Sequence, residues 1–173
     1  MKQMLSLNEK THIGEVVLNV ENLQEMKQFY QTVMGMDIKA ETPSVVSFGA
    51  KGDKTILLTL KAVQAGGPNV RSTGLYHLAL LLPTRQDLGE ILYHLLISGY
   101  PLTGASDHGY SEALYLDDPE GNGVEIYWDK PKSEWDIRPD GQIAGVTDPM
   151  DAESVIAEAK GTFSQLPSGS SIG

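Results

Sequence analysis

The chain has 173 residues and a formal net charge of −10, since 23 Asp and Glu side chains face 13 Lys and Arg. This acidic balance disfavours binding to nucleic acids and to anionic membranes, because both need a basic surface. Hydrophobic residues make up 40% of the chain, which is enough for a folded core, and no apolar run is long enough to cross a bilayer. Cysteine is absent, which excludes disulfides, thiol nucleophiles and Cys-ligated metals. We therefore expect a cytoplasmic globular protein whose chemistry depends on His, carboxylate and hydroxyl side chains.

Two segments of similar pattern follow one another, over about residues 11–61 and 74–129. Each begins with a short apolar strand pattern, at 15–20 in the first segment and at 77–82 in the second. Each continues with a helical pattern and ends with three strand-like runs. We expect these runs at about 36–41, 44–49 and 54–61, and then at 102–108, 111–117 and 123–129.

The two expected helices begin and end alike. Apolar residues recur every three or four positions from Leu23 to Met34 and from Leu88 to Leu96. Asn22 and Thr84 are suitable N-caps, and Gly35 and Gly99 are suitable at the helix ends. The sequence thus predicts an α+β fold, in which two β-α-β-β-β repeats form an open, cupped mixed sheet with helices on the outside.

Side-chain alternation along three of these strands places Glu15, His77 and Glu125 on the sheet face that points away from the helices. An imidazole and two carboxylates on an otherwise apolar face are costly unless they pair with each other or hold a cation. These three residues are therefore candidate metal ligands.

The order and spacing of several motifs resemble the vicinal oxygen chelate superfamily, which includes glyoxalase I, fosfomycin-resistance proteins and extradiol ring-cleaving dioxygenases. The resemblance covers about residues 11–129. Its most specific parts are Phe29-Tyr30 followed by Val33-Met34-Gly35, and the segment 118–126, which reads DPEGNGVEI. The segments THIGE at 11–15 and YWD at 127–129 are most similar to the N-terminal module of bacterial two-module catechol 2,3-dioxygenase-like proteins.

This resemblance implies a divalent metal held in the cup, to which a substrate with two neighbouring oxygens binds. His77 and Glu125 then stand at ligand positions, and His108 stands where extradiol enzymes have a His that handles protons. Fe(II) is the expected metal, with Mn(II), Ni(II) or Zn(II) as alternatives. The expected substrates are a catechol-type molecule and O2. Glu15 departs from the family pattern, because its position usually carries His.

Each candidate also has a simpler interpretation. His77 could be a core His bonded to the backbone, Glu125 a surface carboxylate at a strand end, and His108 a loop residue. Glu15 could form a hydrogen bond with His77 or a Tyr instead of binding metal. For the function, two alternatives to a dioxygenase remain: a glyoxalase-like isomerase acting on a thiol-conjugated oxoaldehyde, or a non-catalytic ligand-binding module that completes a partner's site.

The rest of the chain is less regular. Residues 1–129 are expected to form one module, and 130–173 an extension with a short helix at about 150–160. We expect the extension to be a linker to a second module that begins beyond Gly173. Because half-barrel modules of this kind expose sheet edges, we also expect a homodimer or association with that second module.

Overall fold

A computed structural model describes residues 6–8, 11–64 and 75–159 of the chain. The chain divides into two compact units, Met1–Gly66 and Gly67–Gly173. The predicted extension is described only as far as residue 159. Among the described helices, each one falls short of the length and apolarity that a membrane span requires.

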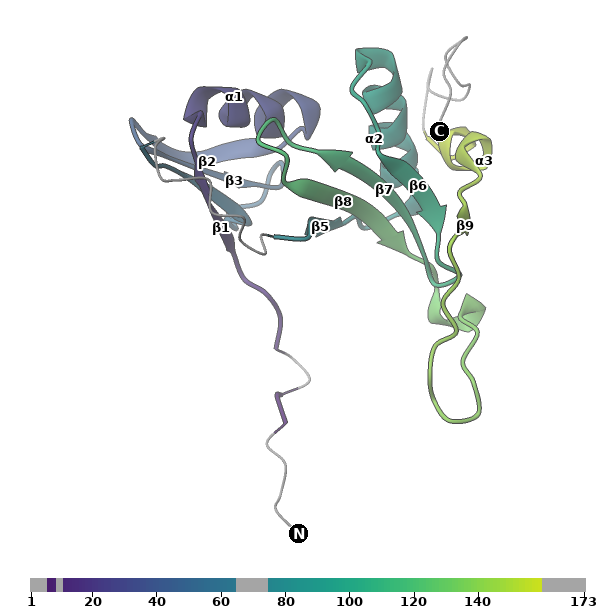
Figure 1. Cartoon of the computed structure of the whole chain (residues 1–173). Helices are drawn as coiled ribbons and strands as arrows, with labels where there is room; N and C mark the ends of the chain where they lie inside the picture. Colours follow the sequence, from purple (N-terminus) through teal and green to yellow (C-terminus); the bar gives the residue numbers. More distant parts are fainter. Residues whose placement is uncertain (1–5, 9–10, 65–74, 160–173) are drawn as a thin grey trace. The chain divides into compact units, whose positions relative to one another are not determined.

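The first unit is one β-α-β-β-β repeat with a four-stranded mixed sheet (Figure 1). Its first strand pairs in parallel with its last, and the other pairs are antiparallel. The strand order is β1-β4-β3-β2. The elements are β1 (Val16–Val20), α1 (Leu23–Gln28), a π-helical turn (Phe29–Val33), β2 (Asp37–Thr42), β3 (Val45–Gly49) and β4 (Leu58–Ala62).

The second unit repeats this plan and extends it by one short strand. Its five-stranded sheet has the order β5-β8-β7-β6-β9, in which β5 and β8 are parallel. The predicted fold class is confirmed, with each repeat forming its own sheet. The elements are β5 (Leu78–Leu81), α2 (Arg85–Ser98), β6 (Gly104–Asp107), β7 (Ser111–Asp117), β8 (Gly123–Asp129), a 3-10 turn (Lys132–Glu134), β9 (Asp148–Pro149) and α3 (Ala152–Ala157).

The predicted helix boundaries are also observed. The Asn22 side chain accepts a hydrogen bond from the backbone N–H of Glu25. Thr84 and Asp87 form a reciprocal capping box at the start of α2. Gly99 ends α2 with a φ of 68°, a left-handed conformation that favours glycine.

The structure differs from the sequence prediction within the first helix. The chain leaves the α-helical pattern at Phe29 and forms a π-helical turn, in which the N–H of Met34 bonds to the carbonyl of Phe29. The Thr32 hydroxyl donates to the Gln28 carbonyl at 2.7 Å, which engages that acceptor inside the turn. The wider turn buries both Phe29 and Tyr30, whereas the regular helical stripe included only Tyr30.

The expected strand at 54–61 begins later than predicted, at Leu58. The Asp53 carboxylate accepts hydrogen bonds from both the backbone N–H and the hydroxyl of Thr55. This side-chain turn competes locally with the extended strand conformation.

The extension after β8 packs onto the second unit. β9 joins the edge of the sheet beside β6, and α3 lies against α2. Val155 and Ile156 of α3 are completely buried, as are Leu88, Leu92 and Leu95 of α2. The core of this unit thus includes residues from beyond the second repeat.

Candidate functional site

The first pair of the candidate site joins the two parallel strands of the second sheet. His77 directly precedes β5, and Glu125 lies in β8. The Nε2 atom of His77 lies 2.8 Å from Oε2 of Glu125. A Cβ at Gly123 would lie 2.6 Å from the Tyr76 carbonyl oxygen, so glycine there permits this close approach of the two strands.

A tight turn fixes where β8 begins and therefore where Glu125 points. The buried carboxylate of Asp118 accepts hydrogen bonds from the backbone N–H groups of Glu120 and Asn122, and from the Asn122 side chain. Gly121 has a φ of 79° in this turn. The turn sets the antiparallel register of β7 with β8, which places Tyr115 opposite Glu125.

Tyr115 links Glu125 to His108. Its hydroxyl donates a 2.8 Å hydrogen bond to Oε1 of Glu125 and lies 2.9 Å from Nε2 of His108. Burial raises the pKa of Tyr115, and the hydrogen bond and charge of Glu125 raise it further. Tyr115 therefore keeps its proton at neutral pH and remains a donor to the carboxylate.

His108 lies in the turn between β6 and β7, and its second ring nitrogen is also engaged. Nδ1 lies 3.0 Å from the carbonyl oxygen of Val146, in the segment that leads to β9. A carbonyl only accepts hydrogen bonds, so Nδ1 carries a hydrogen in this contact. Nε2 is then the ring atom that faces the Tyr115 oxygen.

His77, Tyr115 and His108 border a pocket of about 550 Å³. It lies within the second unit and has both polar and apolar walls, as expected for a small-molecule site. Its lining residues are Tyr76, His77, Thr103, Gly104, Ser106, His108, Tyr115, Leu116, Asp117, Gly123, Val124 and Thr147.

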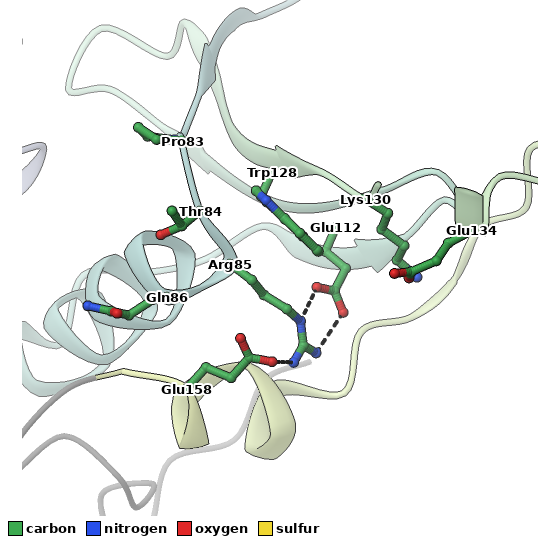
Figure 2. A pocket seen from close by; sticks show the side chains of 9 residues that line it. All are labelled: Pro83, Thr84, Arg85, Gln86, Glu112, Trp128, Lys130, Glu134 and Glu158. Atoms are coloured by element: carbon green, nitrogen blue, oxygen red, sulfur yellow. Dashed lines mark hydrogen bonds and ion pairs between the residues drawn. The ribbon is translucent and has the colours of Figure 1, made fainter. Parts of the chain in front are cut away.

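A second hollow of about 550 Å³ lies beside the start of α2 (Figure 2). Four of its five charged side chains, Arg85, Glu112, Lys130 and Glu158, form ion pairs with each other or with neighbouring groups. Arg85 binds Glu112 and Glu158, and Lys130 binds Asp107. We therefore place the candidate site at the His77 pocket, where a His–carboxylate pair, a phenol and a second imidazole converge.

The structure brings His77, Glu125 and His108 into one network within the second unit. Glu15 belongs to the first unit, where it is exposed directly before β1. Within residues 6–8, 11–64 and 75–159, no three His, Asp or Glu side chains form a group that could hold a metal. The role of Glu15 as a third ligand thus stays a prediction.

His77 and Glu125 fit two adjacent positions in a metal coordination shell. With ligand bonds of about 2.1 Å, neighbouring donors around an octahedral ion lie about 3 Å apart. The 2.8 Å between Nε2 and Oε2 is close to this separation. One nitrogen and one carboxylate oxygen suit a first-row divalent ion, but they supply only part of a protein ligand set.

Tyr115 is a site residue that the sequence motifs above do not include. The necessary signal was present, because the turn at 118–122 pairs the runs 111–117 and 123–129 as a hairpin. That pairing puts Tyr115 and Glu125 next to each other on one face of the sheet.

The chain is similar to two dioxygenases. It is 40% identical to the catechol-2,3-dioxygenase of Bacillus subtilis (strain 168) over 157 residues, which cover 90% of this chain and 55% of that protein. It is 30% identical to biphenyl-2,3-diol 1,2-dioxygenase 3 of Rhodococcus globerulus over 120 residues, which cover 68% of this chain and 63% of that protein. The chain thus spans between about half and two thirds of the length of these relatives.

Solved structures share the fold at lower identity. A glyoxalase/dioxygenase from Nostoc punctiforme matches with a TM-score of 0.57 at 22% identity, over 76% of this chain and 99% of that one. The lactoylglutathione lyase of Agrobacterium tumefaciens matches with a TM-score of 0.55 at 21% identity, over 70% of this chain and 96% of that one. The family model of the Glyoxalase/Bleomycin resistance protein/Dioxygenase superfamily matches residues 12–126. On the match of this model to most of its length, the chain belongs to the Glyoxalase/Bleomycin resistance protein/Dioxygenase superfamily.

Proposed function

We propose that the chain is part of a metal-dependent extradiol dioxygenase that cleaves the ring of catechol-type substrates with O2. The observation that carries the proposal is the network of His77, Glu125, Tyr115 and His108, of which His77, Tyr115 and His108 line one pocket. The 40% identity to a catechol-2,3-dioxygenase supports this class of reaction. Under this proposal, residues 1–129 are one module, and 130–173 lead to a second one.

In this proposal, His77 and Glu125 hold a divalent metal, most simply Fe(II). Mn(II), Ni(II) and Zn(II) are compatible with the same donors. Glu15 is the proposed third ligand because it stands directly before β1, as His77 stands directly before β5. The bound metal would supply Lewis acidity and, for Fe(II), a route for electrons between catechol and O2.

His108 and Tyr115 are the proposed proton-handling residues. A catechol hydroxyl must lose its proton before the ring oxygens carry full negative charge. An Nε2 of His108 without a hydrogen accepts this proton directly, or the Tyr115 hydroxyl turns from Glu125, gives its own hydrogen to Nε2 at 2.9 Å and takes up the catechol proton. The Val146 carbonyl keeps the opposite ring nitrogen protonated, so Nε2 remains the exchanging atom.

The test is to load the chain with Fe(II) under anaerobic conditions, remove unbound iron and then add catechol and O2. We expect both His77→Ala and Glu125→Ala to retain at least tenfold less iron than the parent, since few metal-binding side chains remain. Oxygen consumption that matches catechol loss would support the dioxygenase. Equal iron retention in both variants and the parent would exclude His77 and Glu125 as ligands.

A non-catalytic module is the second candidate function. One observation favours it, because the described residues provide no group of three metal-binding side chains. In that case the chain would retain no stoichiometric metal and would consume no oxygen. The glyoxalase-like alternative has less support, since the likeness to a lactoylglutathione lyase at 21% identity concerns the fold alone.

We also propose that the chain associates with a second copy of itself or with a second module. β1 and β5 are edge strands of their sheets, and Val17 and Leu81, one in each strand, are exposed apolar residues. Exposed edges with apolar side chains are usually covered by a partner.

A further inference from the structure

We propose that the segment of residues 144–159, hereafter the trailing segment, positions His108, and that Arg85 anchors this segment. The effect on turnover rests on the proposed function, whereas the effect on the His108 ring does not.

The trailing segment begins by holding both the ring and the backbone of His108. The Val146 carbonyl accepts from Nδ1 of His108, and the Val146 N–H donates to the His108 carbonyl at 3.2 Å. Two residues later, β9 pairs with β6, where Asp148 lies opposite Asp107. The segment thus fixes the ring from the side opposite to Tyr115.

The far end of the trailing segment is α3, which packs tightly on α2. Val155 and Ile156 of α3 are completely buried. A Cβ at Gly89 of α2 would lie 2.4 Å from the Val155 carbonyl oxygen. Only a glycine at this position lets α3 approach α2 so closely.

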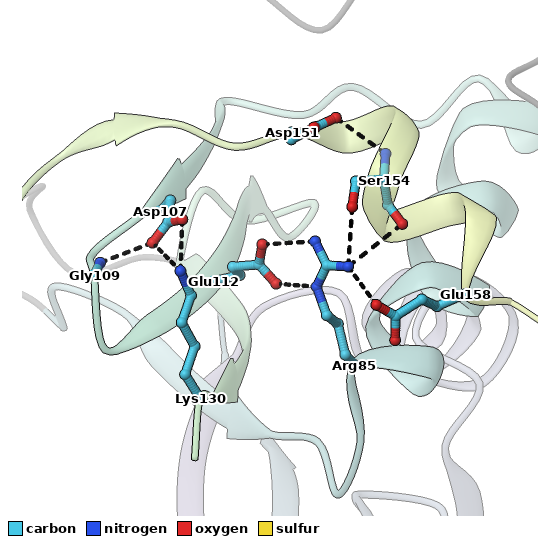
Figure 3. Close-up of polar contacts among 8 residues, drawn as sticks. All are labelled: Arg85, Asp107, Gly109, Glu112, Lys130, Asp151, Ser154 and Glu158. Atoms are coloured by element: carbon cyan, nitrogen blue, oxygen red, sulfur yellow. Dashed lines mark hydrogen bonds and ion pairs between the residues drawn. The ribbon is translucent and has the colours of Figure 1, made fainter. Parts of the chain in front are cut away.

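Arg85, at the first position of α2, holds α3 by polar contacts (Figure 3). Its Nη1 atom donates to Oγ of Ser154 at 3.1 Å and to the carboxylate of Glu158. The Asp151 side chain caps α3 by accepting from the Ser154 N–H. Arg85 therefore binds α3 near its start and directly after its end.

The same guanidinium also binds the turn end of the β6–β7 hairpin, which carries His108. Nε and Nη2 of Arg85 donate to the two oxygens of the buried Glu112 carboxylate, at 2.6 and 2.9 Å. Glu112 lies in β7 opposite Asp107, one residue before His108. Such a two-pronged contact fixes direction as well as distance. Arg85 thus connects the trailing segment to the strand next to the site and is a positioning residue.

Two substitutions release α3 by different means. Arg85→Gln removes the charged contacts, and Gly89→Ala pushes α3 away from α2 without changing any charge. Arg138→Gln is the matched control, because it makes the same charge change at an exposed position before the trailing segment. His108→Gln identifies the ring signal of His108 in spectra of ¹⁵N-labelled protein.

The measurement is hydrogen exchange by NMR in the metal-free chain. We expect both variants to exchange the Val155 and Ile156 amides faster, and to exchange the Nδ1–H of His108 at least about tenfold faster than the parent. The Arg138→Gln control should match the parent. If Arg85→Gln fails to fold because Glu112 loses its partner, Gly89→Ala decides alone.

Two outcomes would overturn the proposal. If the Val155 and Ile156 amides exchange at the parental rate in both variants, Arg85 and Gly89 do not anchor α3. If these amides exchange faster but the Nδ1–H of His108 exchanges at the parental rate, the trailing segment does not position His108. In an active protein, we also expect kcat to fall about tenfold with KM and metal affinity unchanged. A parent without turnover would contradict the proposed function, while the exchange data would still decide on the positioning of His108.

Discussion

Tyr115 joins the two halves of the candidate site, since its single hydroxyl contacts both Glu125 and His108. Tyr115→Phe keeps the ring and removes only this oxygen. We expect the free energy of unfolding to fall by about 1–2 kcal/mol, because a half-buried carboxylate and an imidazole each lose a partner. Metal binding through His77 and Glu125 should persist, and turnover should fall by about a hundredfold.

The check combines denaturant unfolding, metal titration and oxygen uptake on this variant. Tyr93→Phe, which makes the same change on α2, is the control and should keep parental turnover. Full activity in Tyr115→Phe would show that His108 acts without Tyr115.

Asp107, the residue next to His108, contributes to the stability of the fold in a way that depends on pH. Burial raises the pKa of Asp107, but hydrogen bonds from Lys130 and the Gly109 N–H lower it more, so the net pKa lies below its ordinary value. A carboxylate with a lowered pKa stabilises the fold above its unfolded-state pKa, and this stability is lost as the pH falls. We expect Asp107→Asn to lower the free energy of unfolding by about 1 kcal/mol at pH 7 and by much less near pH 3.

Urea unfolding at the two pH values measures this difference. Asp129→Asn, a change at the exposed end of β8, should have little effect at either pH. A penalty for Asp107→Asn that is as large at pH 3 as at pH 7 would mean that Asp107 acts through packing and not through its charge.

The sequence predicted His77, Glu125 and His108 because strand alternation and the superfamily's motifs fall on them directly. Tyr115 was not predicted as a site residue, because its role depends on Glu125 in the strand opposite it. The role of Arg85 could not be predicted from local sequence, since its partners Ser154 and Glu158 are about seventy residues away in the chain. A contact between a helix start and a distant short helix leaves no local pattern in either segment.

At the scale of elements, the pairing of β5 with β8 depends on Gly123. A Cβ there would lie 2.6 Å from the Tyr76 carbonyl oxygen and 3.3 Å from Cβ of His77. We expect Gly123→Ala to push the start of β5 away from β8, which lowers the free energy of unfolding by about 1–3 kcal/mol and weakens metal binding.

Gly14→Ala is the matched control, because a Cβ at Gly14 meets no atom within 4 Å. Calorimetric unfolding and metal titration of both variants are the measurements. Metal affinity in Gly123→Ala equal to that of the parent would mean that the His77–Glu125 distance does not control binding.

Elements with a strong local code were predicted almost to the residue. Caps at Asn22 and Thr84 and the glycine at 99 set the helix boundaries. The π-helical turn at Phe29–Val33 was not predicted, because a helical stripe and a π turn differ by a single residue in spacing. The late start of β4 depends on the Asp53–Thr55 turn, a competition that hydrophobic periodicity does not report.

At the scale of the whole molecule, the number of metal ligands limits affinity. The second unit supplies the two proposed ligands His77 and Glu125, and we expect this chain to bind Mn(II) at least about tenfold more weakly than the longer Bacillus subtilis relative. Equilibrium dialysis of both proteins measures the difference. Equal affinity would show that the chain is sufficient for metal binding, and Glu15→Ala would then tell whether Glu15 contributes.

Association is the second expectation at this scale. We expect sedimentation of the chain at micromolar concentration to give a dimer, because the apolar residues Val17 and Leu81 are exposed on edge strands. Leu81→Lys should shift the equilibrium toward monomer, whereas Ile97→Lys, on α2, should not. A parent that sediments only as a monomer would contradict the proposed association.

The strand order of the two sheets has a consequence for biosynthesis. In each repeat the first strand forms its hydrogen bonds with the last strand, since β1 pairs with β4 and β5 pairs with β8. The first strand therefore has no partner until the last strand has been synthesised. Neither repeat can complete its strand pairing until its last strand, β4 or β8, has left the ribosome. The strands of the first sheet end at Ala62. Because domains fold as units during synthesis, the N-terminal repeat is ready to fold while the ribosome is still making the second. The second unit is completed last, because β9 joins its sheet and α3 packs on α2 only after both have been synthesised.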